Sequence, residues 1–90
     1  MFQWDADKEI SNIEKHGISF RVALHVFEDP NYIEIYDYEH SITEDRYNVI
    51  GMVNDVLFVV YTERDNNIRL ISARKATEQE RRVYYGRGYN

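Results

Sequence analysis

The sequence predicts a small α+β domain in which a mostly antiparallel sheet packs against helices. Helical spacing of apolar residues comes first, four short segments rich in Val, Ile and Tyr follow, and a capped helical segment closes the chain. The connections between the four segments are short, whereas parallel neighbours need a crossover of about a dozen residues or more. We therefore expect the order ααββββα, with a four-stranded sheet as one layer and the helices on one face as the second.

The first two helices are predicted from their caps and apolar spacing. Asp5 can cap the first helix, and Gly17 can end it. Ser19 can cap the second helix, which should stop at residues 29–30, because the residue before proline disfavours helical backbone. The expected apolar faces consist of Ala6, Ile10 and Ile13 in the first helix and of Phe20, Ala23, Val26 and Phe27 in the second.

Four strands and a final helix follow from the pattern of residues 32–85. Asn54-Asp55 is a two-residue hairpin signal, residues 65–67 form a second polar turn, and residues 40–45 read as a polar loop. The apolar run VLFVVYT is typical of a central strand buried on both faces. The strands are expected at residues 32–36, 46–53, 56–62 and 68–73, the helix at about 77–85, and the tail at 86–90 should fray.

Length and composition favour one cytoplasmic domain over residues 1–90. The 90 residues include no cysteine, which excludes disulfides and a thiolate metal site. No apolar run approaches about 18 residues, and the acidic N-terminus does not resemble a signal peptide, so no membrane segment is expected. The net charge of −5 is uneven: residues 1–63 carry 4 Lys/Arg and 13 Asp/Glu, whereas residues 64–90 carry 7 and 3. A locally basic third can contact a polyanion although the whole chain is acidic.

The segment IRLISARKATEQERRVY, at residues 68–84, is the most informative part of the chain. A strand ends there in two adjacent cations, Arg74 and Lys75. Thr77 and Glu80 then have the T-x-x-E spacing of a capping box at the start of a helix. Free N–H groups at a helix N-terminus and nearby cations both favour anions, so this junction predicts a phosphate-binding site.

The remaining motifs give no sign of a metal or cofactor. The three histidines are far apart in sequence, neither H-x-x-x-H nor H-E-x-x-H occurs, and no Gly-rich phosphate loop or G-x-S-x-G elbow is found. We therefore expect catalysis, if any, to depend on side chains alone.

Three segments, FQWDADKEISNIEKHGISF, HSITEDR and VVYTERDNNIRLISARKATEQERRVY, resemble the BrnT family of type II toxin–antitoxin systems. The resemblance covers essentially the whole chain in order. It implies a RelE-like fold, metal-independent ribonuclease activity that inhibits translation, and neutralisation by a BrnA antitoxin. It further implies that the antitoxin carries a ribbon-helix-helix DNA-binding domain, that a 2:2 complex forms, and that operator DNA is bound only through the antitoxin.

Metal-free RNA cleavage by the 2′-hydroxyl needs a proton acceptor, a proton donor and cations that stabilise the phosphorane oxygens. Arg74 and Arg64 are the first candidates for these cations, since guanidinium can hold two phosphate oxygens at once. A salt bridge from Arg74 to Glu80 and an ordinary exposed turn residue at Arg64 are the structural alternatives. Further candidates for RNA or phosphate binding are Lys75, Arg46 and Arg81.

Candidates for acid–base chemistry are weaker. His40 and Glu44 lie four residues apart in HSITEDR, where the carboxylate could orient the imidazole, although a solvated loop has the same composition. Tyr84 on the last helix could stack on an RNA base or, alternatively, cover the core.

Two functional classes therefore remain open at this stage. The first is a ribonuclease toxin, and the second is a non-catalytic binding module that acts as a corepressor within an antitoxin–DNA complex. In either class the acidic segment at residues 28–45 offers a surface for a basic or amphipathic antitoxin segment.

Overall fold

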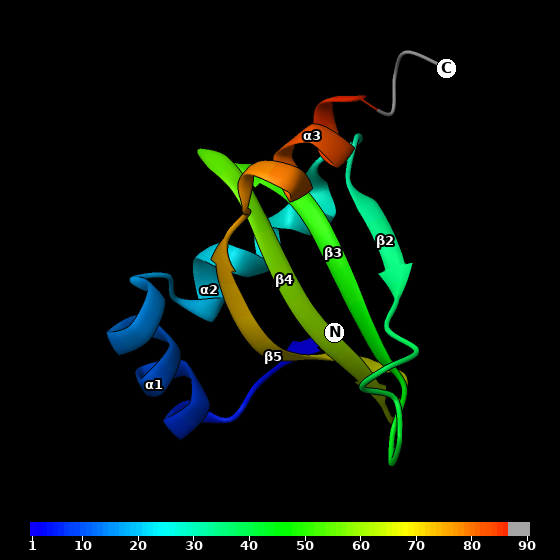
Figure 1. The fold of residues 1–90 in the computed structure, drawn as a ribbon. Helices are drawn as coiled ribbons and strands as arrows, with labels where there is room; N and C mark the ends of the chain where they lie inside the picture. The colour runs from blue at the N-terminus through cyan, green and yellow to red at the C-terminus, as the bar shows by residue number, and fades with distance from the viewer. Residues whose placement is uncertain (87–90) are drawn as a thin grey trace.

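The computed structural model describes residues 1–86, and a five-stranded sheet forms its centre (Figure 1). The strand order is β1-β5-β4-β3-β2, and neighbours are antiparallel except for β1 and β5, which run parallel. The four predicted strands are confirmed at their predicted positions. The sheet nevertheless has five strands instead of four, because the first residues of the chain add an edge strand. The strands are β1 (Phe2–Gln3), β2 (Ile33–Tyr36), β3 (Arg46–Val53), β4 (Asp55–Arg64) and β5 (Asn67–Lys75).

The helices begin at the predicted caps. Asp5 accepts hydrogen bonds from two backbone N–H groups at the start of α1, and Gly17 ends that helix with φ of 72°. Ser19 caps the next segment, which is α-helical only at first and continues as a 3₁₀-helix rather than as the single helix predicted. The helical elements are α1 (Ala6–His16), α2 (Phe20–Ala23), η1 (Leu24–Glu28) and α3 (Glu78–Gly86). Gly86 of the predicted tail thus ends α3, and residues 87–90 lie outside the described residues.

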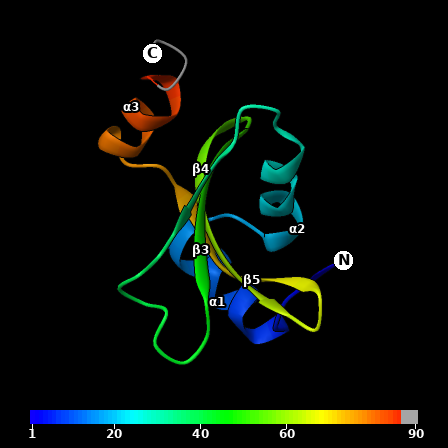
Figure 2. The ribbon, with the colours of Figure 1, turned by 90° about the vertical axis from the view of Figure 1, so that its right-hand side faces the viewer.

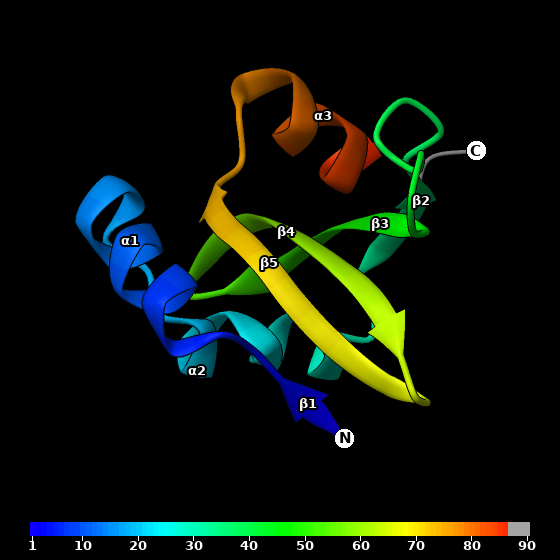
Figure 3. The same cartoon turned by 90° about the horizontal axis from the view of Figure 1, so that it is seen from below.

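The helices lie on both faces of the sheet, so the predicted two-layer arrangement is wrong. Figures 2 and 3 show α2 on one side of the strands and α3 on the other. The larger core lies under α2 and η1, where Phe20 and Ala23 pack against Val49, Val59 and other buried side chains. A smaller cluster forms on the opposite face of the sheet under α3. The strand residues that point to this face alternate with those of the larger core and are also apolar. The cluster consists of Ile50, Val56 and Tyr84, with Met52, Phe58 and Ala76 around it.

A buried amide fastens α1 to β5. Asn12 is 5% exposed, and its Nδ2 donates to the carbonyl oxygens of Ile18 and Ala73 at 2.8 Å each. The backbone N–H of Ala73 donates back to Oδ1 of Asn12 at 3.1 Å. Asn12 therefore satisfies both backbone groups of Ala73, as a neighbouring strand would.

A β-bulge changes the pairing of β5. Val60 is opposite Ser72, whereas the next residue of β4, Tyr61, is opposite Leu70, so Ile71 is an extra residue in β5. Leu70 and Ala73 remain in the main core, while Ile71 stays half-buried. Since α3 covers only one end of the second face, the strand surface beyond it stays open to solvent.

Candidate active site on the open face of the sheet

A cleft of about 420 Å³ lies on the face of the sheet that α3 leaves open. The loop between β2 and β3 swings to the same side of the sheet as α3, as Figure 2 shows, and forms one wall. The polar and charged side chains that line the cleft come from this loop, β3 and β5: Asp37, Glu39, His40, Arg46, Asn48, Ser72 and Arg74. Three of the eight predicted site residues, His40, Arg46 and Arg74, thus meet in one place.

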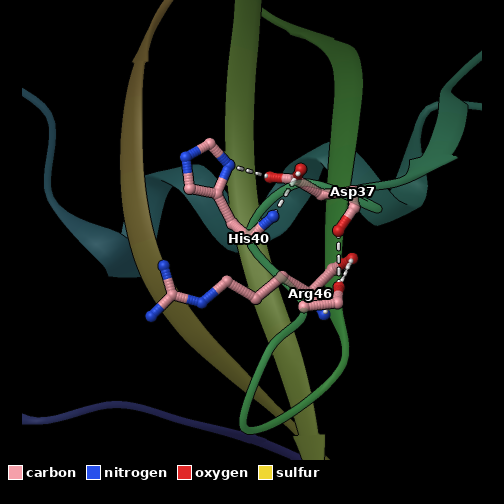
Figure 4. A network of polar contacts seen from close by, with 4 residues as sticks. Asp37, His40 and Arg46 are labelled. Carbon is pink, nitrogen blue, oxygen red and sulfur yellow. Dashed lines mark hydrogen bonds and ion pairs between the residues drawn. The ribbon is translucent and has the colours of Figure 1, made fainter.

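His40 is held by Asp37, not by Glu44 (Figure 4). The imidazole Nδ1 lies 2.9 Å from Asp37 Oδ2, and the backbone N–H of His40 donates to Oδ1 at 3.2 Å. The loop is closed by Ser41, whose Oγ donates to the carbonyl of Asp37 and accepts from the N–H of Arg46. An ionised carboxylate only accepts hydrogen bonds, so Nδ1 of His40 is the donor in this contact, and Nε2 is the ring nitrogen that can take up a proton.

The charge of Asp37 is stabilised by the same contacts. Burial alone would raise the pKa of the carboxyl, but the hydrogen bonds from the ring and the backbone of His40 outweigh it and hold the pKa below its usual value. Asp37 is consequently ionised at neutral pH and can both orient the imidazole and stabilise it after it takes up a proton.

Arg46 provides an unpaired cation beside this dyad. In Figure 4 its side chain extends over the sheet on the same side as the imidazole of His40. Within residues 1–86, its guanidinium has neither an ion-pair partner nor a hydrogen bond, and only its backbone groups are bonded. Five N–H donors are therefore available to an anion in the cleft.

Arg74 lines the cleft but is already paired. Its guanidinium donates to both oxygens of Glu80, at 2.8 and 3.0 Å, and lies 4.2 Å from the ring centroid of Phe58. The Glu80 hydrogen bonds raise the pKa of Arg74. Glu80 also accepts from the N–H of Thr77, so the capping box is confirmed, and the anion that occupies this helix N-terminus is the protein's own carboxylate. Glu80 thus occupies the position at the junction of β5 and α3 that was predicted to bind phosphate. Arg74 lines the cleft with the part of its side chain that remains exposed.

The other predicted cation, Arg64, lies in an adjoining depression of about 170 Å³. It donates to Glu44 at 3.0 Å, so these two predicted residues are brought together with each other and not with His40. Arg46 lines both the cleft and this depression, and Lys8 and Arg69 also line the depression.

Three predicted residues are placed away from the cleft. Arg81 donates to Asp55 at 2.7 Å, and Lys75 lies 4.0 Å from the same carboxylate. Tyr84 is 8% exposed and donates its hydroxyl to Asp29 at 2.6 Å. The ring of Tyr84 packs in the smaller core cluster with Ile50 and Val56.

Sequence reasoning missed four polar or charged residues of the cleft, Asp37, Glu39, Asn48 and Ser72. The D-x-x-H spacing of Asp37 and His40 was visible in the sequence, and an Asp three residues before a loop histidine often closes a turn through its side chain. Asn48 and Ser72 gave no signal, because only the strand pairing brings both to one face next to Val60. The Oδ1 atom of Asn48 is buried and has no hydrogen-bond partner.

Residues 1–86 contain neither a membrane-spanning helix nor a cluster of metal-binding side chains. No helix in this range is long and apolar enough to span a membrane. No three His, Cys, Asp or Glu side chains of the same range are grouped as a metal site would require.

Comparisons with known proteins identify the family. The chain is similar in structure to the crystallised ribonuclease toxin BrnT of Brucella abortus, with a TM-score of 0.70 and 25% sequence identity, over 87% of this chain and 99% of that one. No curated protein sequence matches it. Residues 4–80 match the model of a family described as the ribonuclease toxin BrnT of type II toxin–antitoxin systems. The chain therefore belongs to the BrnT family of ribonuclease toxins.

Proposed function

We propose that this toxin is a metal-independent endoribonuclease that cleaves cytoplasmic RNA and thereby inhibits translation, with its active site in the cleft around His40. The observation that carries the proposal is the unpaired Arg46 beside an imidazole that a carboxylate orients. These groups supply what transfer of a phosphoryl group to a 2′-hydroxyl requires, namely a proton acceptor and a cation for the phosphorane oxygens.

In the proposed reaction, Nε2 of His40 removes the proton of the 2′-hydroxyl, whose oxygen then bonds to the adjacent phosphorus. Asp37 stabilises the imidazolium that results, and Arg46 stabilises the charge on the non-bridging oxygens, with the exposed part of Arg74 beside it. The bond from phosphorus to the 5′-oxygen breaks, and water in the open cleft supplies the proton that this oxygen takes up. The products are a 2′,3′-cyclic phosphate and a 5′-hydroxyl, and His40 returns its proton to the solvent.

Arg64 and Glu44 have a supporting place in this proposal. Their ion pair is half exposed on the Arg64 side and lies in the depression that shares Arg46 with the cleft. Arg64 is positioned for a neighbouring phosphate, and Glu44 fixes its orientation. Lys75 and Arg81 share the single carboxylate of Asp55, which compensates only one of their two charges, so they contact RNA where the substrate chain continues past α3.

The partner follows from the family and from the acidic surface. We propose that a BrnA-like antitoxin with a ribbon-helix-helix domain neutralises this toxin in a 2:2 complex, and that the fold is RelE-like. The acidic segment 28–45 supports a basic antitoxin segment as the ligand, since it carries seven Asp and Glu residues and no Lys or Arg.

The test compares His40→Ala with His25→Ala when the chain is expressed alone in cells. The side chain of His25 is 50% exposed and forms an ion pair only with Glu28, so the control removes an imidazole away from the cleft. We expect wild type and His25→Ala to arrest growth and degrade RNA, and His40→Ala to do neither while remaining folded. Purified wild type should cleave RNA in the presence of a chelator. Absence of arrest by folded wild type would favour the corepressor module instead.

A further inference from the structure

Three depressions of the surface meet at the bulge residue Ile71. The cleft around His40 shares Arg46 and Ile71 with the depression that contains Arg64. A third depression, of about 220 Å³, lies between α1 and β5 and shares Ile71 and Ser72 with the cleft. The second and third also share Lys8. The three therefore form one continuous path from the open face of the sheet to α1, over the part of the sheet edge where β5 extends beyond its pairing with β1.

Cations are concentrated along this path. The three depressions are lined by 6 of the 11 Lys and Arg residues of the chain, but by only 3 of its 16 Asp and Glu residues. The surface along this path is therefore positive although the whole chain has a net charge of −5. An even distribution of the charged residues would not give such a local excess of cations. We call the part outside the cleft the cation track; its basic residues are Lys8, Lys15, Arg64 and Arg69.

The lysines of the cation track have no partner of their own. Within residues 1–86, neither the Nζ of Lys8 nor that of Lys15 lies in an ion pair or a hydrogen bond. Both are exposed on α1, where Lys15 follows Lys8 by seven residues and hence falls on the same helix face. Two free ammonium groups about two turns apart on one helix face make that face positive, and the phosphates of one strand can neutralise it.

We propose that the cation track binds the phosphates of a single-stranded RNA that continues from the scissile phosphate in the His40 cleft. This inference rests on the proposed ribonuclease function and extends it to the form of the substrate. The path turns over the edge of the sheet from one face to α1, and Figure 3 shows α1 beside β5 at that edge. A flexible single strand can follow such a turn, whereas a stiff A-form duplex cannot enter narrow depressions on two sides of an edge.

The chemistry of the third depression favours RNA over an acidic protein segment. Six of its seven lining residues are polar or charged, and Ile71 is the only apolar one. A bound protein segment needs apolar anchors to offset its ordering, while phosphates need only cations and hydrogen-bond donors. Ser11 lines this depression as well and adds a hydroxyl group beside the lysines.

The test measures binding of a 2′-O-methyl RNA, which cannot be cleaved, by fluorescence anisotropy over a range of salt concentrations. The probe is an unstructured strand of about 12 nucleotides, within the span that small single-strand binding domains cover. The variant Lys8→Gln/Lys15→Gln is compared with Arg21→Gln/Arg82→Gln, which removes the same charge from residues outside the three depressions. Thermal unfolding of each variant checks that the fold is intact.

With the lysine variant, the slope of log affinity against log salt should decrease by about 1.4, because each lost phosphate contact on a single strand accounts for about 0.7. The control should keep the wild-type slope. Cleavage of a dinucleoside monophosphate, which fits the cleft alone, should proceed at the wild-type rate in both variants.

Equal slopes for the two variants would overturn the proposal. So would a lysine variant that binds RNA normally but escapes neutralisation by the antitoxin, since the track would then hold an acidic protein segment. A reduced salt dependence in the lysine variant, together with a wild type that cleaves no RNA, would support RNA binding by the cation track and refute the ribonuclease mechanism. Failure of the binding proposal and failure of the proposed function can therefore be told apart.

Discussion

The amide of Asn12 allows a quantitative test of how α1 is attached to the sheet. Replacement by Ala removes two donated hydrogen bonds and one accepted bond, and it leaves both backbone groups of Ala73 without a partner. Ala73 is fully buried, so water does not reach these groups without local opening of the structure.

The expected loss can be worked out from these groups. Leaving a buried backbone donor or acceptor unsatisfied costs about 1–3 kcal/mol, so the two groups of Ala73 together set a loss of about 2–6 kcal/mol. The carbonyl of Ile18 adds little, because Ile18 is half-buried and solvent can replace the amide there. At about 4–8 °C per kcal/mol for a domain of this size, a loss of 3 kcal/mol lowers the melting temperature by about 12–24 °C.

The assay is urea unfolding followed by circular dichroism, with Asn31→Ala as the control. Asn31 is exposed and contributes only its backbone N–H to a hydrogen bond, so its variant should unfold like wild type. Asn12→Asp should also destabilise at neutral pH, because a carboxylate would face two carbonyl oxygens, and it should recover in part in acid, where the protonated group can donate. A loss below about 1 kcal/mol for Asn12→Ala, at unchanged denaturant dependence, would refute the reasoning.

Four further predictions concern the site and the core. His40→Ala should lower the rate of RNA cleavage by about 100- to 10,000-fold, the usual contribution of a general base, in a single-turnover assay. Asp37→Asn should have a lower free energy of unfolding than wild type, and this difference should shrink as the pH falls, measured by unfolding at a series of acid pH values. The pKa of Asp37 is held below its ordinary 3.8, so the stabilisation by the carboxylate is complete above pH 3.8 and is lost at lower pH. Val59→Asp should leave the chain unfolded by circular dichroism, since Val59 is 0% exposed. Glu80→Gln should strengthen phosphate binding by Arg74, measured by anisotropy, at a cost of about 1 kcal/mol in stability.

Each of these has a clear contrary result. Normal cleavage by folded His40→Ala would move the proton acceptor elsewhere. A gap between wild type and Asp37→Asn that stays constant down to acid pH would mean that the His40 contacts do not stabilise the charge. A folded Val59→Asp would contradict the placement of β4, and unchanged RNA affinity in Glu80→Gln would mean that Glu80 does not compete with phosphate.

The elements of the fold could be predicted wherever a local rule applied. Asp5, Gly17 and Ser19 act as caps where predicted, because capping depends on a few adjacent residues. The strand β1 could not be predicted, since its two residues are too few to show alternation and its partner lies 66 residues away. The face of the sheet that α3 covers could not be predicted either. It depends on the hydrogen bond from the backbone N–H of Ala76, after the end of β5, to the carbonyl oxygen of Val56 in β4.

The site was predictable in its residue types but not in its pairs. His40, Arg46 and Arg74 line one cleft, yet the partner of His40 is Asp37 and the partner of Arg64 is Glu44, 20 residues earlier in the chain. Spacing along the sequence indicates which groups can meet on one helix or turn, and the pairs across strands depend on register. The pairing of Arg74 with Glu80 was found as an alternative because both lie at one local junction.

The way α3 is attached has a consequence for hydrogen exchange. The helix is nine residues long, buries only Tyr84, and is held otherwise by polar contacts such as Arg81 with Asp55 and Glu80 with Arg74. A helix this short is marginal without its packing, so α3 can open by itself while the sheet stays closed. Its amide protons should then exchange with solvent well before those of β4, and a ligand that holds α3 in place would slow that exchange without changing the exchange of the central strand.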